Sequence, residues 1–313
     1  MSEQKPKPAA PPGTPKSQLE IGEIRQREPD RNFHRGGRSF YFFDFDDNIA
    51  FLTTPLILFH KETGQDLPVS SVEWALHHNT IGKSGIYSEF EIRWDDQTGT
   101  FKNFRDLNFS ELERLQGRKQ PFVQDILLAL GIPDLQWKGP SWDCFYHATF
   151  NSRPMSIITA RGHSEEVLRS GIFEFVKAGY LPMEPNYLSL FAVSNKKTRT
   201  QLGDTELIMS TAQLKQKAIR ASVEKAIEVY GYSPHHRFGM SDDDPKNIQL
   251  IVEEMARLKS KYPEMSFFMI ETHNGDFIKH EVTQHGLKTP YVHDGSEQLD
   301  LFSFLTRPYS TKD

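Results

Sequence analysis

The chain has 313 residues, of which 37% are hydrophobic, so it can bury a substantial core as one large domain or two smaller ones. Its 37 Lys and Arg residues against 42 Asp and Glu residues give a net charge of −5, which does not indicate nucleic-acid binding, although it does not exclude it. The single cysteine, Cys144, excludes a disulfide within the chain, and no stretch has the apolar length of a membrane span or a signal peptide. We therefore expect a soluble, cytoplasmic protein without a membrane role.

Residues 1–36 are expected to form a disordered, proline-rich tail. The stretch 5–15 is rich in proline and has no large apolar side chain, so neither a helix nor a strand can bury a face there. Chain termini are commonly loose, and we therefore favour an inert tail over a docking segment.

The first strand is predicted at residues 40–43, an aromatic run that ends in the acids Asp44, Asp46 and Asp47. A carboxylate inside a strand that is covered on both faces is costly, so these acids belong at the strand's carboxyl end. Open α/β sheets bind their ligands at that edge. Because clustered carboxylates repel one another unless a cation is present, the pattern indicates a hard divalent metal and an anionic substrate.

Apolar runs and helix signals alternate through most of the remaining chain. Further strands are predicted at residues 155–159, 187–193, 237–240 and 266–270, and Asn274-Gly275 predicts a hairpin turn into 277–278. Helices are predicted from 164 to about 179, from 210 to 231 and from 245 onward. This alternation predicts an α/β, Rossmann-like three-layer sandwich with a mostly parallel sheet, formed by residues 37–49 and 154–290 and followed by a C-terminal extension at 291–313.

Residues 50–153 interrupt this alternation and are interpreted as a cap or lid over the carboxyl edge of the sheet. Within this insert, 91–94 and 100–104 flank a turn like a hairpin, and 122–130 is predicted to be a short amphipathic helix. All four tryptophans of the chain lie in the insert. They are expected to form the core of the lid, with stacking on a base or sugar of the substrate as the alternative.

Four signals stand near strand ends or helix starts, in the order Asp44-x-Asp46, Thr159, Lys215 and the acidic cluster at 242–247. Their order and content resemble the haloacid dehalogenase superfamily, most of whose members are magnesium-dependent phosphohydrolases. The resemblance spans residues 39 to about 270 and places the insert where that family has its cap. The first and last signals are specific only in combination.

The resemblance implies a role for each acid. Asp44 would attack phosphorus and form an aspartyl-phosphate, while Asp46 would protonate the leaving oxygen and later activate water. The Asp44 carboxylate, the Asp46 main-chain carbonyl and Asp242 would hold Mg²⁺, with Asp243 nearby or bound through water. A small phosphorylated substrate is favoured by the acidic net charge.

Three further residues are expected to contact the phosphate. Thr159 offers a hydroxyl and neighbouring N–H groups at the start of a helix. Lys215 matches the family's lysine best, and Lys217 is close enough in sequence to be the alternative. Arg161 would either touch the substrate phosphate or be exposed at the surface.

Charge counting also favours a metal at this site. The four aspartates Asp44, Asp46, Asp242 and Asp243 would meet a substrate that carries nearly two further negative charges. At ~4 Å each like-charge pair costs roughly 4 kcal/mol at an effective dielectric constant of 20. The site is therefore expected to need its metal.

One residue departs from the family pattern. Asn48 stands where the family usually has threonine or valine, and that position supports the acid/base aspartate. The alternative function is therefore a non-catalytic or regulatory module that binds a phosphorylated ligand or a partner protein. A response-regulator receiver is disfavoured, because receivers place their acid pair on the first strand and the phosphorylated aspartate on a later one.

Overall fold

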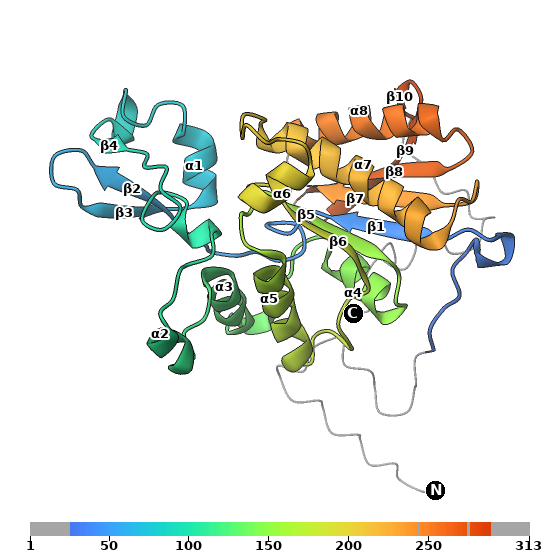
Figure 1. Ribbon diagram of the computed structural model, residues 1–313, viewed down its shortest axis with the longest axis horizontal. Coiled ribbons are helices and arrows are strands. Elements are labelled where there is room, and N and C mark those ends of the chain that lie inside the picture. The colour runs from blue at the N-terminus through green and yellow to red at the C-terminus, as the bar shows by residue number, and fades with distance from the viewer. Residues whose placement is uncertain (1–25, 243–244, 274–275, 289–313) are drawn as a thin grey trace, which may run out of the picture.

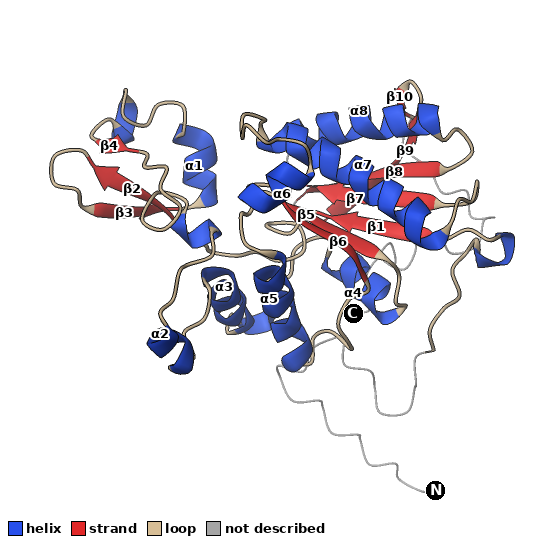
Figure 2. Cartoon of the chain, viewed as in Figure 1, coloured by secondary structure: helices blue, strands red, loops and turns tan. Residues whose placement is uncertain are grey.

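The computed structural model describes residues 26–242, 245–273 and 276–288. They form an α/β fold around a seven-stranded, mostly parallel sheet with helices on both faces (Figures 1 and 2). The α/β class is thus confirmed, and the layering is consistent with a Rossmann-like sandwich. The strands of this sheet are β1 (Ser39–Phe43), β5 (Met155–Thr159), β6 (Tyr187–Ala192), β7 (Arg237–Asp242), β8 (Ser266–His273), β9 (Asp276–Thr283) and β10 (Gly286–Leu287).

The strand order is β10-β9-β8-β7-β1-β5-β6, with β1 at the centre. β1 pairs in parallel with β5 on one side and with β7 on the other. The chain builds outward from β1 through β5 and β6 and then returns to β7 and β8, so the order reverses between β1 and β7. Open α/β sheets bind their ligands at such a reversal, outside the carboxyl ends of the strands.

The outer edge of the sheet is antiparallel. β8 and β9 pair from Phe267 with Val282 to His273 with Asp276, which confirms the predicted hairpin. Its turn residues, 274 and 275, lie outside the described residues.

Helices cover both faces of the sheet, and none of those in the described part of the chain is long and apolar enough to cross a membrane. One face carries α7 and α8, and the other carries α3, α4 and α5. They span α3 (Pro121–Leu130), α4 (Trp142–Phe150), α5 (Glu165–Lys177), α7 (Thr211–Tyr230) and α8 (Pro245–Lys261), with the short α6 (Lys196–Gln201) after β6.

Alternate side chains of β1 enter two separate cores. Phe40 and Phe42 pack in the cluster that includes α7 and α8, whereas Tyr41 and Phe43 pack in the cluster that includes α3, α4 and α5. All four side chains are at most 2% exposed. Because both faces of the strand are covered, residues 40–43 are all aromatic, and the first polar side chain after them, Asp44, stands at the carboxyl end of the strand.

A small second sheet lies beside the main one at the carboxyl end of its strands (Figure 1). Its order is β3-β2-β4, and it has its own apolar cluster with Leu58 and Tyr87 at its centre. The elements of this unit are β2 (Leu56–His60), β3 (Asp66–Val69), α1 (Ser71–His77) and β4 (Phe90–Glu91), followed along the chain by α2 (Glu111–Leu115).

The hairpin predicted from 91–94 and 100–104 is wrong. β4 pairs antiparallel with β2, and Lys102–Phe104 is a short 3₁₀ turn instead of a strand. Residues 93 and 100 do meet, through the Thr100 N–H and the Arg93 carbonyl at 2.8 Å. The sequence analysis did not single out the apolar β2. This strand pairs with β4 in place of the partner that the hairpin would have supplied.

The predicted insert 50–153 does not pack as one unit. Its first half forms the small sheet, but α3, α4 and the segment between them belong to the main core, where Phe122 and Phe145 are fully buried. The helix predicted at 122–130 is confirmed as α3. The boundary predicted at 153 therefore separates α3 and α4 from α5, although all three helices pack in one layer against the sheet.

The tryptophans divide in the same way. Trp137 and Trp142 are 0% and 2% exposed in the main core, against the expectation that they form the core of a lid. Trp74 packs against the small cluster, while Trp94 is 75% exposed and stacks on Phe101.

Residues 26–36 of the predicted tail are held against the core. Asp30 is 8% exposed and accepts hydrogen bonds from the Ser39 N–H at 2.7 Å and the Ser39 hydroxyl at 3.0 Å. The Glu28 N–H donates to Asn151 at 2.7 Å. The prediction of a disordered tail is thus wrong for these residues, and residues 1–25 and 291–313 lie outside the described part.

Candidate active site

Asp44 follows β1 directly and stands between the ends of two strands. Its N–H donates to the carbonyl of Ser241 in β7 at 3.0 Å, which extends the parallel pairing by one step. The Asp44 side chain is 10% exposed. A carboxylate this buried needs a cation or several donors close by.

Lys215 supplies a cation between two carboxylates. Its Nζ lies 3.1 Å from Asp44 Oδ2 and donates to Asp242 Oδ2 at 2.8 Å. Lys215 is 2% exposed and Asp242, the last residue of β7, is fully buried. Burial alone would lower the pKa of Lys215, but the carboxylates of Asp44 and Asp242 together raise it above its ordinary value. The ammonium is therefore a permanent charge of the site.

The start of α7 explains why Lys215, and not Lys217, reaches the site. Ser210 and Gln213 form a capping box that begins this helix. Two residues on along a helix, a side chain points to a different side. Lys217 accordingly donates to the Leu202 carbonyl at 3.0 Å, on another side of the helix.

Asp46 lies beside the end of β5, where Arg161 binds it at two points. Arg161 Nε is 2.9 Å from Asp46 Oδ2, and Nη2 is 2.7 Å from Oδ1. The Thr159 hydroxyl donates to Asp46 Oδ2 at 3.3 Å and accepts the Arg161 N–H at 3.2 Å. Arg161 is 1% exposed, so the expectation that it is a surface residue is wrong.

Asn48 fastens the loop that carries Asp44. Its Nδ2 donates to the Asp44 carbonyl at 3.0 Å and to the Ser241 hydroxyl at 2.8 Å. Its Oδ1 accepts hydrogen bonds from Ser141 at 2.8 Å and Thr272 at 3.0 Å. Asn48 is fully buried, and these contacts hold the loop in place through its main chain and its neighbours.

Asp47 takes the left-handed conformation, with φ of 57°, and its N–H donates to the Ala50 carbonyl at 3.0 Å. Asp47 therefore acts as a turn residue. Burial and the neighbouring charge of Asp46 also raise the pKa of Asp47 to about 6. The sequence analysis did not foresee this second carboxyl that can hold a proton near neutral pH.

The donor set fits Mg²⁺. Asp44 and Asp242 are brought together by one ammonium, and Mg²⁺ is commonly held by one or two carboxylates while it keeps several waters. Within the described residues, no three His, Cys, Asp or Glu side chains gather closely enough to hold a metal on their own. Asp243, the remaining predicted ligand, lies outside those residues.

The charge argument for a metal is weaker in the structure than in the sequence. Asp44, Asp46 and Asp242 face two buried cations, Lys215 and Arg161. The two cations thus offset part of the negative charge before any metal is added. What still calls for a further cation is the substrate, because a phosphate dianion would add nearly two negative charges.

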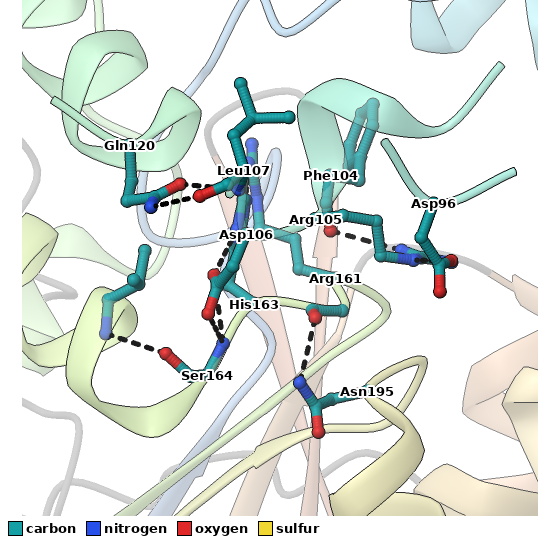
Figure 3. Close-up of polar contacts among 12 residues, drawn as sticks. Asp96, Phe104, Arg105, Asp106, Leu107, Gln120, Arg161, His163, Ser164 and Asn195 are labelled. Carbon is teal, nitrogen blue, oxygen red and sulfur yellow. Dashed lines mark hydrogen bonds and ion pairs between the residues drawn. The ribbon is translucent and has the colours of Figure 1, made fainter. Parts of the chain in front are cut away.

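The loop after β5 is joined to the segment 104–106 by a row of polar contacts (Figure 3). The Gly162 N–H donates to the Phe104 carbonyl at 2.9 Å. Asp106 lies 3.1 Å from the His163 ring and accepts the Ser164 N–H at 3.1 Å. This junction was not predicted, because nothing in the spacing of residues 104–106 marks them as neighbours of Gly162.

Comparisons with protein-family models, with curated proteins and with solved structures found no match to this chain.

Proposed function

We propose that the protein is a Mg²⁺-dependent phosphohydrolase that cleaves small phosphomonoesters through an aspartyl-phosphate on Asp44. The observation that carries the proposal is the buried Lys215 ammonium between Asp44 and Asp242, at the point where the strand order reverses. A carboxylate nucleophile repels a phosphate dianion, so a fixed cation beside the nucleophile is what the reaction requires.

The described residues, together with water, account for each proton transfer and for each bond made and broken in the reaction. In the first step an oxygen of Asp44 bonds to phosphorus while the ester oxygen leaves and takes a proton from Asp46. In the second step Asp46 takes a proton from water, the water oxygen bonds to phosphorus, and the Asp44 carboxylate is released. Lys215 offsets negative charge on the phosphoryl oxygens in both steps.

Asp44, the main-chain carbonyl of Asp46 and Asp242 would hold Mg²⁺, which when bound neutralises charge on the phosphate. Thr159 and the N–H groups that follow it stand at the end of β5 next to Asp46, where they would orient the phosphate oxygens.

The small sheet is the part of the chain best placed to act as a cap. The chain leaves the core at Ala50, directly after the Asp44 loop, and returns beside Gly162 at Phe104. Both connections lie at the carboxyl ends of the main-sheet strands, where Asp44 also stands. A cap attached there would limit the substrate to small phosphorylated molecules.

Substitution of the nucleophile tests the proposal. We expect Asp44→Asn to lower Mg²⁺-dependent release of phosphate from an aryl phosphate by at least about 1,000-fold, because the amide cannot form the acyl phosphate. Glu228→Gln, at an exposed acid on α7, is the matched control and should leave the rate unchanged. Undiminished activity in Asp44→Asn would rule out the proposed chemistry.

The alternative is a non-catalytic module that binds a phosphorylated ligand or partner. It is favoured by the two-point ion pair between Asp46 and Arg161, because protonating Asp46 would break that pair. A melting-temperature measurement with Mg²⁺ and beryllium fluoride, combined with an assay of phosphate release, separates the two functions. Both predict a rise in melting temperature that depends on Asp44, whereas only the enzyme also releases phosphate.

A further inference from the structure

Arg161 is packed into the site as tightly as Lys215, but it faces Asp46 instead of Asp44. Its side chain is 1% exposed, whereas the Asp46 side chain remains 30% exposed. The guanidinium donates hydrogen bonds to both carboxylate oxygens of Asp46, at 2.7 to 3.0 Å. Two-point pairs of this kind fix direction as well as charge.

The N–H donors of Arg161 are all accounted for by the protein. A guanidinium has five of them. Nε and one N–H of Nη2 face Asp46, and the other N–H of Nη2 faces Thr54 Oγ1 at 2.6 Å. Nη1 lies 3.5 Å from Asp125 Oδ2 and 3.5 Å from His163 Nε2. A substrate phosphate would have to displace one of these partners.

Two of those partners come from the insert. Thr54 stands where the chain leaves for the small sheet, and Asp125 lies in α3. The Thr54 hydroxyl also donates to Asp125, so Thr54, Asp125 and Arg161 form a closed triangle. The rings of Phe104 and Phe122 lie 4.9 and 4.8 Å from the guanidinium carbon, close enough for cation–π attraction.

His163 closes the remaining side of the guanidinium. Its Nδ1 lies 3.1 Å from Asp106 Oδ1, and its Nε2 faces Arg161. Since Arg161 can only donate, the ring must be neutral, with its proton on Nδ1 toward Asp106. Burial lowers the pKa of His163, which agrees with the neutral form.

We propose that Arg161 is a positioning residue, which aims Asp46 for water activation and is itself held by Thr54, near the start of the small sheet, and by Asp125 on α3. This differs from the phosphate-binding role expected from the sequence, and it rests on the proposed phosphohydrolase function. The contacts of Arg161 thus connect Thr54 and α3 to the second step of the reaction.

The proposal assigns Arg161 to one step of two. Asp46 accepts hydrogen bonds from Arg161 and Thr159, and it acts as an acceptor again when it takes a proton from water as the water oxygen bonds to phosphorus. The bond between phosphorus and Asp44 then breaks and returns the Asp44 carboxylate. Loss of Arg161 should therefore slow the breakdown of the aspartyl-phosphate more than its formation.

The test compares Arg161→Ala with Arg169→Gln, an arginine on α5 that pairs with Glu165 and Glu184 at the surface. We expect Arg161→Ala to lower kcat by about 100-fold, since misplacing a catalytic group by ~1 Å can cost that much, with KM changed less than about threefold. Labelled, hydroxylamine-sensitive phosphoenzyme should accumulate. Arg169→Gln should match the wild type.

Two further readouts separate positioning from a loss of folding. Millimolar guanidinium ion should restore part of kcat in Arg161→Ala, because it can enter the vacated space beside Asp46. Thr54→Val and Asp125→Asn retain Arg161 and should lower kcat in the same direction by about 10-fold, as outer partners of catalytic groups do. If both variants keep wild-type kcat, the link to the insert is refuted.

Beryllium fluoride distinguishes the failure of this inference from the failure of the proposed function. The Mg²⁺-dependent rise in melting temperature should survive in Arg161→Ala, because the acyl-phosphate mimic needs Asp44 and Lys215 but not Arg161. Loss of that rise, or a raised KM with unchanged kcat, would make Arg161 a phosphate ligand. Absence of both the rise and activity in the wild type would refute the phosphohydrolase and the positioning role with it.

Discussion

Asn48 shows how a single side chain can hold the loop that carries Asp44. A threonine at this position has one hydroxyl, whereas Asn48 uses both ends of its amide to join Asp44, Ser241, Ser141 and Thr272. Of the two acids Asp44 and Asp46, Asn48 hydrogen-bonds the main chain of Asp44 and not Asp46. We therefore interpret Asn48 as a structural anchor of the nucleophile loop, and Arg161 as the residue that supports Asp46.

His163 makes the stability of the protein depend on pH. Burial lowers the pKa of His163 in the folded state below that of an unfolded histidine, about 6.5. Between the two pKa values the unfolded chain binds the proton and the folded chain does not, so stability is present above about pH 6.5 and falls as the pH drops. Protonation would also place a positive ring against Arg161.

We expect His163→Gln to reduce the loss of melting temperature between pH 7 and pH 5. Glutamine can still donate toward Asp106 and accept from Arg161 but does not titrate. The control is His285→Gln, at an exposed position, which should keep the wild-type dependence. An unchanged pH profile in His163→Gln would show that the ring is protonated, or solvated, in the folded protein.

At the scale of elements, the loop after β1 is pressed against the chain that enters α4. The Gly139 N–H donates to the Ile49 carbonyl at 2.9 Å, and the Ser141 N–H donates to the Asn48 carbonyl at 2.8 Å. A Cβ on Gly139 would lie 2.3 Å from the Asn48 carbonyl oxygen. That oxygen belongs to the backbone of the nucleophile loop and cannot rotate away.

Gly139→Ala should therefore destabilise the protein by about 2 kcal/mol or more, since overpacking against an unyielding neighbour costs on this order. It should also displace the Asp44 loop and lower activity beyond the loss of folded protein. Gly131→Ala, whose Cβ would meet nothing closer than 3.2 Å, is the control. Denaturant titration and activity per folded molecule would measure the two effects.

The elements of the main sheet could be predicted because each is locally distinct. β5, β6, β7 and β8 are apolar runs bounded by helix caps, and a parallel sheet needs no other signal. The hairpin predicted at 91–104 was wrong because its local pattern does not identify the partner strand. Alternation within a segment indicates a half-buried strand but does not name its partner, and β4 pairs with β2 instead.

At the scale of the whole molecule, the structural units differ from the core and insert predicted from the sequence. Asn103 Nδ2 donates to the Pro55 carbonyl at 2.9 Å, so the small sheet enters and leaves the core at one place. Further along the chain, α3, α4 and the segment between them are part of the main core. The small sheet should therefore be removable, whereas α3 and α4 should not.

Replacing residues 56–102 by a short glycine–serine linker tests this division. We expect the shortened protein to remain folded and to keep the Asp44-dependent response to Mg²⁺ with beryllium fluoride, while its selectivity among phosphomonoesters decreases. Phe145→Ala, which removes a fully buried ring of α4, should instead cost about 3–5 kcal/mol. Unfolding of the shortened protein would show that the small sheet is part of the core.

The sequence by itself determined the parallel strands of the main sheet and the position of Asp44 and Asp242 at their carboxyl ends. Local periodicity places acids after apolar strands, and the carboxyl ends of parallel strands meet at one edge. Only the tertiary structure decided that Lys215 is the bridging lysine, that Arg161 binds Asp46, and that Thr54 and Asp125 hold Arg161. Those contacts depend on how α3 packs against the core, and side-chain direction at long sequence separation leaves no local pattern.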